Sequence, residues 1–268
     1  MHPIAFQFGR FTIYWYGILT AAGFMIGFWT ASRRGIRDRL KPEVIMDSAL
    51  WILIGTVVGA RALHVISYWS DQYSHQPWQE IFMIQKGGLV YYGGLIGASI
   101  AAVLYTRVKH VPLWKYADAL APSVALGHAF GRIGCLMTGC CYGKECHLPW
   151  AITFPPGHET HPFNLPQGTP VHPTQIYESG LNLCLYFFLA WAYRRKKFDG
   201  QIFAVYLMIY AVLRSFVEVF RADYKPHEFV FHVLSPGQLV SIFAFAIGGV
   251  LFWMFSRHRP ASTETGNG

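Results

Sequence analysis

Long apolar stretches recur along the whole chain and constrain its fold more than any other feature. An α-helix needs about 20 such residues to cross the hydrocarbon core of a bilayer. Seven stretches reach that length, at 11–32, 44–68, 87–106, 114–137, 174–193, 201–221 and 237–255. Only 13% of the residues are charged, which is about half the fraction of an ordinary soluble domain. The sequence therefore predicts an all-α integral membrane protein with seven transmembrane helices, in one domain over residues 1–268.

Positive charge is distributed unevenly between the connections and predicts how the chain is oriented. Fourteen of the 22 lysines and arginines lie in alternate connections, in the groups 33–41, 107–115, 194–197 and 257–259. Because cytoplasmic loops carry the excess of Lys and Arg, we expect a periplasmic N-terminus and a cytoplasmic C-terminus. The long connections at 69–86, 138–173 and 222–236 then face outward. The net charge of +8 reflects this topology, so we expect no nucleic-acid partner.

Three charged residues interrupt the sixth apolar stretch. Arg214, Glu218 and Arg221 are spaced i, i+4, i+7, which places them on one face of a helix. A charge facing hydrocarbon costs from about 3 to more than 10 kcal/mol, so such residues usually face a partner, a cavity or a ligand. Together with Arg132 in the fourth stretch, they predict a buried cationic site that holds a phosphate. The alternative is that Glu218 only neutralises buried arginines.

Two other residues allow more than one interpretation. Arg132 can bind an anion through its planar guanidinium, or it can extend along the apolar surface to the membrane interface. Arg61, in the second stretch, belongs to the same charged site or anchors its own helix.

Histidines are the other titratable candidates. His172 precedes Pro173, which suits the start of a helix, and it is a ligand contact or a capping residue. His64 and His128 lie in no motif that assigns them a role.

Four cysteines lie within twelve residues, in the segment GCLMTGCCYGKEC. The spacing C-x4-C-C-x4-C of Cys135, Cys140, Cys141 and Cys146 matches none of the common structural zinc patterns. An outward-facing loop permits disulfides. A structural disulfide, unpaired thiols and a metal site all stay open. Cys184, in the fifth stretch, is expected to pack in the core.

Six motifs in order along the chain resemble those of the prolipoprotein diacylglyceryl transferases. They are IYWYG at 13–17, GGLVYYGGLIG at 87–97, GRIGCLMTGCCYG at 131–143, HPTQIYE at 172–178, LRSFVEVFR at 213–221 and SPGQLVS at 235–241. The resemblance implies transfer of the diacylglyceryl group from phosphatidylglycerol to a cysteine thiol in a prolipoprotein signal peptide. A thioether forms and glycerol phosphate leaves. It also implies a multi-pass protein of the bacterial inner membrane, with no metal and no organic cofactor.

The same resemblance assigns roles to individual residues. It implies a catalytic set and a set that binds phosphatidylglycerol. The catalytic residues would be Arg214, Tyr92 and Glu218, and the binding residues would be Arg132, Tyr16, Arg221, Gly143 and His172.

This chain departs from the family pattern at three positions. The family often has a histidine where this chain has Tyr92, an asparagine where it has Cys135 and a glutamate where it has Cys140. A tyrosine is a poor base at neutral pH, because its ordinary pKa is about 10. Two alternatives follow: a paralogue that modifies a different acceptor, or a membrane protein that handles thiols or metals through the cluster from Cys135 to Cys146.

Overall fold

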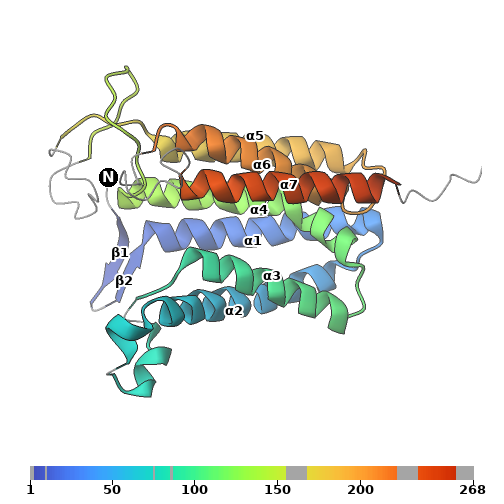
Figure 1. The fold of residues 1–268 in the computed structure, drawn as a ribbon, viewed down its shortest axis with the longest axis horizontal. Coiled ribbons are helices and arrows are strands. Elements are labelled where there is room, and N and C mark those ends of the chain that lie inside the picture. Colours follow the sequence, from blue (N-terminus) through green and yellow to red (C-terminus); the bar gives the residue numbers. More distant parts are fainter. Residues whose placement is uncertain are drawn as a thin grey trace, which may run out of the picture. The chain divides into compact units, whose positions relative to one another are not determined.

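The computed structural model describes residues 3–9, 11–74, 76–84, 87–154, 168–221 and 235–257 (Figure 1). Seven α-helices lie in these residues, one at each predicted stretch. They are α1 (Trp15–Gly35), α2 (Pro42–Ser67), α3 (Tyr91–Val108), α4 (Leu113–Thr138), α5 (Thr174–Tyr193), α6 (Gln201–Glu218) and α7 (Pro236–Arg257). Each helix end falls within four residues of its predicted position. The central part of the predicted outward loop at 138–173 lies outside the described residues.

The prediction that the first helix begins at residue 11 is wrong. Strand β1 (Ile4–Phe8) pairs antiparallel with β2 (Phe11–Tyr14), and α1 starts only at Trp15. Residues 11–14 are aromatic or β-branched, and such side chains favour strands. Gly9 turns the chain with a φ of +58°, a conformation that glycine adopts without strain. The fold is therefore mainly helical, with one short hairpin before the first helix.

Three of the described helices, α2, α6 and α7, are long and apolar enough to cross a membrane. This length and composition confirm a mainly helical membrane protein. Polar, charged and small residues lower the hydropathy of the other four helices, so their crossing of the membrane stays a prediction.

The described chain divides into two compact units. The first contains residues 1–31 and 117–268, and the second contains residues 32–116. The hairpin, most of α1 and α4, and helices α5, α6 and α7 belong to the first unit. Helices α2 and α3 belong to the second, together with a short π-helical turn (Trp69–Tyr73) and a 3-10 turn (Trp78–Phe82).

Glycines allow α2 and α3 to pack closely in the second unit, where the two helices run side by side (Figure 1). A Cβ atom on Gly97 would lie 2.0 Å from the carbonyl oxygen of Gly55, and one on Gly59 would lie 2.3 Å from that of Gly93. Neither backbone leaves room for a side chain. The glycine-rich third stretch therefore serves helix packing at these positions, as in other membrane proteins.

A buried aspartate explains the weak hydropathy of the fourth stretch. The Asp118 carboxylate accepts hydrogen bonds from the backbone N–H groups of Gly200 (2.9 Å), Ile202 (2.9 Å) and Phe203 (3.0 Å). The Lys196 ammonium lies 3.2 Å from the same carboxylate. Asp118 on α4 thus caps the start of α6, where the helix dipole favours a negative charge.

Candidate active site

Four charged side chains from α4, α5 and α6, and a fifth from Arg221 just after α6, lie close together in the first unit. Arg132 Nε on α4 lies 2.9 Å from Glu178 Oε2 on α5, and Arg221 Nη1 lies 3.5 Å from the same oxygen. On α6, Arg214 Nη1 lies 2.5 Å from Glu218 Oε2. None of these side chains exposes more than 16% of its surface. We call this group the arginine cluster. Glu218 pairs with Arg214, as expected, and Arg132 and Arg221 share the carboxylate of Glu178.

Glu178 lies at the centre of the cluster, although no role was predicted for it. Its carboxylate contacts two of the arginines and lies 3.2 Å from His128 Nε2. Tyr210 OH lies 3.4 Å from the other ring nitrogen of His128. The available signal was a polar stripe on α5: Gln175, Glu178 and Asn182 are spaced i, i+3, i+7 in an otherwise apolar helix and are all buried.

Arg221 reaches the cluster by a different route from the one predicted. Helix α6 ends at Glu218, so Arg221 does not extend the helical face of Arg214 and Glu218. Its backbone instead forms a β-bridge with Gly143, and its side chain turns towards Glu178. The prediction of a single helical stripe over all three residues is therefore wrong, although the residue does belong to the site.

The start of α7 closes over Glu218. Ser235 Oγ donates a hydrogen bond of 2.8 Å to Glu218 Oε1 and also accepts the backbone N–H of Gln238 at 3.1 Å. A Cβ atom on Gly237 would lie 2.5 Å from Glu218 Oε1. The SPGQ motif therefore combines a helix cap with a close approach to the buried ion pair.

Gly143 and His172 shape the loop beside Arg221. The Gly143 N–H donates to the His172 carbonyl at 2.9 Å, and a Cβ atom there would lie 2.5 Å from the Phe220 carbonyl oxygen. The His172 ring packs against Phe220 and lies 3.2 Å from Tyr177 OH through Nδ1. In this structure both residues position the chain around the cluster.

The two predicted tyrosines, Tyr16 and Tyr92, belong to different units. Tyr16 lies in the first turn of α1, where a Cβ atom on Gly134 of α4 would approach its ring to 2.9 Å. Tyr16 also interacts electrostatically with Arg132. Tyr92 lies in the first turn of α3, in the second unit. Its role with the arginine cluster stays a prediction.

All five cysteines are free thiols. The Sγ atoms of Cys135, Cys140 and Cys141 lie within 4.8 Å of one another. Cys146 is buried outside that group. Cys184 is exposed on α5, so the prediction that it packs in the core is wrong. Its helix presents that position on the apolar outer surface.

The three neighbouring thiols lie in the electric field of the arginine cluster. Hydrogen bonds from the Cys135 and Cys140 thiols lower the pKa of the Cys141 thiol. The positive charges of Arg132 and Arg221 act in the same direction. The end of α4 and the turn after it thus share the positive potential that the arginines create.

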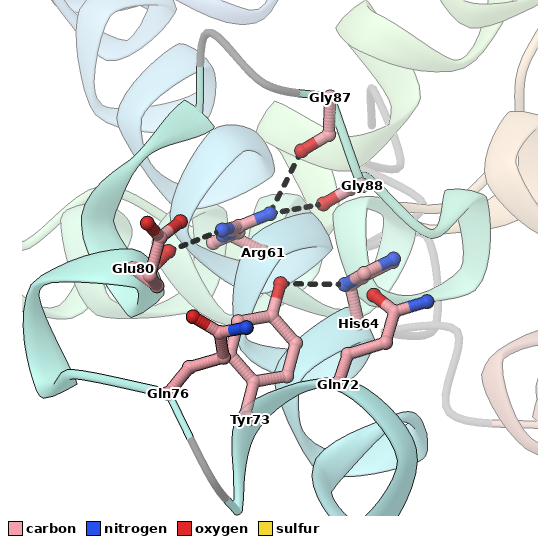
Figure 2. Close-up of a pocket in the computed structure, with 8 residues that line it drawn as sticks. All are labelled: Arg61, His64, Gln72, Tyr73, Gln76, Glu80, Gly87 and Gly88. Atoms are coloured by element: carbon pink, nitrogen blue, oxygen red, sulfur yellow. Dashed lines mark hydrogen bonds between the residues drawn. The ribbon is translucent and has the colours of Figure 1, made fainter.

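The second unit contains a polar pocket of about 420 Å³ (Figure 2). Arg61 lies at its centre, and Nε, Nη1 and Nη2 all donate to backbone carbonyls, which belong to Glu80, Ile81, Gly87 and Gly88. His64 Nδ1 lies 3.2 Å from Tyr73 OH. Because its donors are used by backbone, Arg61 anchors the connection after α2. These contacts support the anchoring role among the two that the sequence left open.

The fold and the site define a class: a mainly helical membrane protein that buries several arginines between its helices. The chain belongs to the prolipoprotein diacylglyceryl transferase family, whose sequence model matches residues 3–254. This confirms the family that the six motifs indicated.

Individual relatives agree over nearly the full length. The chain is 37% identical to the phosphatidylglycerol–prolipoprotein diacylglyceryl transferase of Finegoldia magna, over 94% of each chain. It is 33% identical to the enzyme of the same name from a Nostoc species, over 96% of this chain and 91% of the relative. The Legionella pneumophila enzyme is also 33% identical, over 94% and 96%.

Proposed function

We propose that this protein transfers the diacylglyceryl group of phosphatidylglycerol to the cysteine thiol of a prolipoprotein signal peptide. The cysteine sulfur forms a bond to the glyceryl carbon, and the bond from that carbon to the phosphate oxygen breaks. The thiol gives up a proton, and glycerol phosphate leaves. Family membership over residues 3–254 and relatives that carry this name support the reaction.

The arginine cluster is the observation that carries the proposal. Among the described residues of the site, three guanidinium groups face two carboxylates. This leaves an excess of positive charge in a buried place. The amide oxygens of Gln175 and Asn182, on the α5 face that carries Glu178, are buried without a hydrogen-bond partner in the described structure. A bound phosphate diester would balance the charge, and its glycerol hydroxyls would have acceptors nearby.

Arg132, Arg214 and Arg221 would hold the phosphate in place during transfer. Negative charge grows on the leaving phosphate as the bond to carbon breaks, and fixed donors in a site without water stabilise such charge strongly. Arginine suits this role because its planar fork can contact two phosphate oxygens at once. Glu218 and Glu178 keep the guanidinium groups in position before the lipid binds, so little reorganisation is needed.

The acceptor thiol must lose its proton, since the thiolate is the nucleophile. Tyr92 would contribute by hydrogen bonding rather than as a base. His128 is a candidate for the group that accepts this proton, because its ring contacts both Glu178 and Tyr210. Tyr16 would contact the lipid headgroup beside Arg132. His172 and Gly143 would act by shaping the loop next to Arg221.

The family match covers both compact units, which supports one transferase domain over residues 1–268. We propose that all seven helices cross the bacterial inner membrane, with the N-terminus periplasmic and the C-terminus cytoplasmic. The alternation of Lys and Arg between connections supports this orientation. The partners are then phosphatidylglycerol, prolipoprotein signal peptides and the bilayer itself.

The test is transfer by the purified full chain in phosphatidylglycerol micelles, with a peptide that carries a lipobox cysteine. The mass of the peptide reports the thioether, and released glycerol phosphate reports the leaving group. We expect both in equal amounts, and neither with Arg132→Ala. If a folded protein binds the lipid but transfers nothing to the peptide, the proposed acceptor is wrong. The paralogue with another acceptor then replaces this proposal.

A further inference from the structure

Three cysteine side chains converge at the end of α4. Cys135 lies in the last turn of the helix, whereas Cys140 and Cys141 follow in the turn after it. Their Sγ atoms all lie within 4.8 Å of one another. The fourth cysteine of the motif, Cys146, lies elsewhere. The structure therefore brings three of the four thiols together, whereas the sequence did not distinguish among the four.

The backbone holds these thiols in a defined turn. The N–H groups of Gly139 and Cys140 both donate to the Cys135 carbonyl, at 2.9 and 3.1 Å. Gly139 and Cys141 both have positive φ, of +78° and +61°. This conformation is uncommon for a residue with a side chain and costs about 1 kcal/mol. At Cys141 it directs the side chain back towards the other two thiols.

Helix α5 fixes the same turn from outside. Gln175 Nε2 donates to the Cys140 carbonyl at 2.7 Å, and Thr174 Oγ1 donates to the Cys141 carbonyl at 2.8 Å. Both side chains are buried. The three thiols therefore approach one another because the surrounding chain places them there, before any ligand is bound.

We propose that Cys135, Cys140 and Cys141 form a binding site for a thiophilic metal ion, with Zn²⁺ as the first candidate. Thiolates bound to zinc at about 2.3 Å lie about 3.8 Å apart in a tetrahedral site, so the observed separation needs only a small closure. One position of the ion stays open for water or an external ligand. This proposal holds whether or not the protein carries out the proposed lipid transfer.

The surroundings suit the charge of such a site. Zn²⁺ with three thiolates carries one net negative charge. Arg132 lies one turn before Cys135 on α4, and it interacts electrostatically with both Cys135 and Cys141. A nearby guanidinium balances the buried negative charge, which would otherwise oppose metal binding. The ion would tie the last turn of α4 to the turn after it, which Gln175 and Thr174 already hold to α5. It would so stabilise the segment that carries Arg132.

The first experiment measures metal bound to the full chain, purified in detergent without chelator and then supplied with Zn²⁺. We expect about one zinc ion per protein. Titration of the metal-free protein with Co²⁺ should give the absorption of a tetrahedral thiolate complex. Alkylation followed by mass spectrometry should show three additional reactive cysteines after the metal is removed. These measurements use the unaltered chain, so they do not depend on a variant that folds.

Matched variants then locate the site. Cys140→Ser should reduce zinc content at least tenfold and lower the thermal midpoint of the zinc-loaded protein, because the ion stabilises only the folded state. Cys184→Ser, on the exposed face of α5, should keep full zinc content. A protein that takes up no zinc, or that keeps its zinc in Cys140→Ser, would overturn the proposal. So would a disulfide among these three residues in the native protein.

Discussion

Two buried charge clusters lie at opposite ends of α6, and they differ in how their charge is balanced. At the start of the helix, the Asp118 carboxylate accepts three backbone N–H groups and pairs with Lys196. At the end, Arg214 pairs with Glu218 inside a cluster that, among the described residues, holds more guanidinium groups than carboxylates. Both arrangements follow the helix dipole, which favours an anion at the N-terminus and a cation at the C-terminus.

From this difference we infer a structural role for the cluster at Asp118 and a binding role for the arginine cluster. Around Asp118 the donors come mostly from the backbone, so the folded chain satisfies the carboxylate by itself. The arginine cluster adds buried amide oxygens without partners among the described residues and a surplus of positive charge. The described residues of this site carry more positive than negative charge, and in the proposed function a phosphate completes it. Removing charge at one end of α6 should therefore impair folding, and removing it at the other should impair transfer.

The largest effect is expected for Arg214→Ala. Transfer should fall about 1000-fold, or ~4 kcal/mol in transition-state stabilisation, because a preorganised donor to the leaving phosphate is lost. The measurement is kcat/KM for the lipobox peptide in phosphatidylglycerol micelles. Arg195→Ala is the matched control, because Arg195 stacks on Trp191 outside the cluster, and it should transfer normally. Normal turnover by a well-folded Arg214→Ala variant would refute the phosphate role.

Asp118→Ala should act on stability. It removes the acceptor of three backbone N–H groups and one of two carboxylates that contact Lys196, which keeps its contact with Asp199. The free energy of unfolding should fall by about 3 kcal/mol. Asp118→Asn keeps one oxygen acceptor and should lose less. Thermal unfolding in detergent measures both variants. Transfer per folded molecule at low temperature should be unchanged, and a selective loss of transfer would place Asp118 in the catalytic machinery.

Arg132→Lys tests whether the cluster needs the shape of arginine or only its charge. Lysine keeps the charge but cannot reproduce the planar fork of donors. We expect kcat/KM to fall about 30-fold, or ~2 kcal/mol, while the thermal midpoint stays close to that of the unaltered protein. Activity equal to that of the unaltered enzyme would show that Arg132 contributes only a point charge.

The smallest effect is expected for Ser235→Ala. This change removes the cap of α7 and the hydrogen bond to Glu218, and should lower the free energy of unfolding by ~1 kcal/mol. Transfer should fall only a few-fold, because Arg214 still holds Glu218. Ser235→Thr, which keeps the hydroxyl, should restore both. A loss of transfer as large as that of Arg214→Ala would mean that Ser235 itself contacts the substrate.

The site could be predicted in part. Arg132, Arg214 and Glu218 stand out in the sequence because a charge in an apolar stretch needs a reason to be there. Glu178 does not stand out, because it follows polar neighbours near the start of a helix. His128 does not stand out, because it interrupts a stretch that is only weakly apolar. His128 lies one turn before Arg132 on α4 and contacts it at 3.2 Å. Only the packing of α4 against α5 shows that Glu178 meets both residues.

The sequence by itself determined the helices, their order and the residue types at the site. Apolar length and charge placement are local properties, and they require no knowledge of which helices become neighbours. The tertiary structure decided which charges pair: it gave Arg221 to Glu178, made Asp118 a helix cap and brought three of five cysteines together. Such pairings join residues far apart in the chain, so they depend on the packing of helices and on the turns between them.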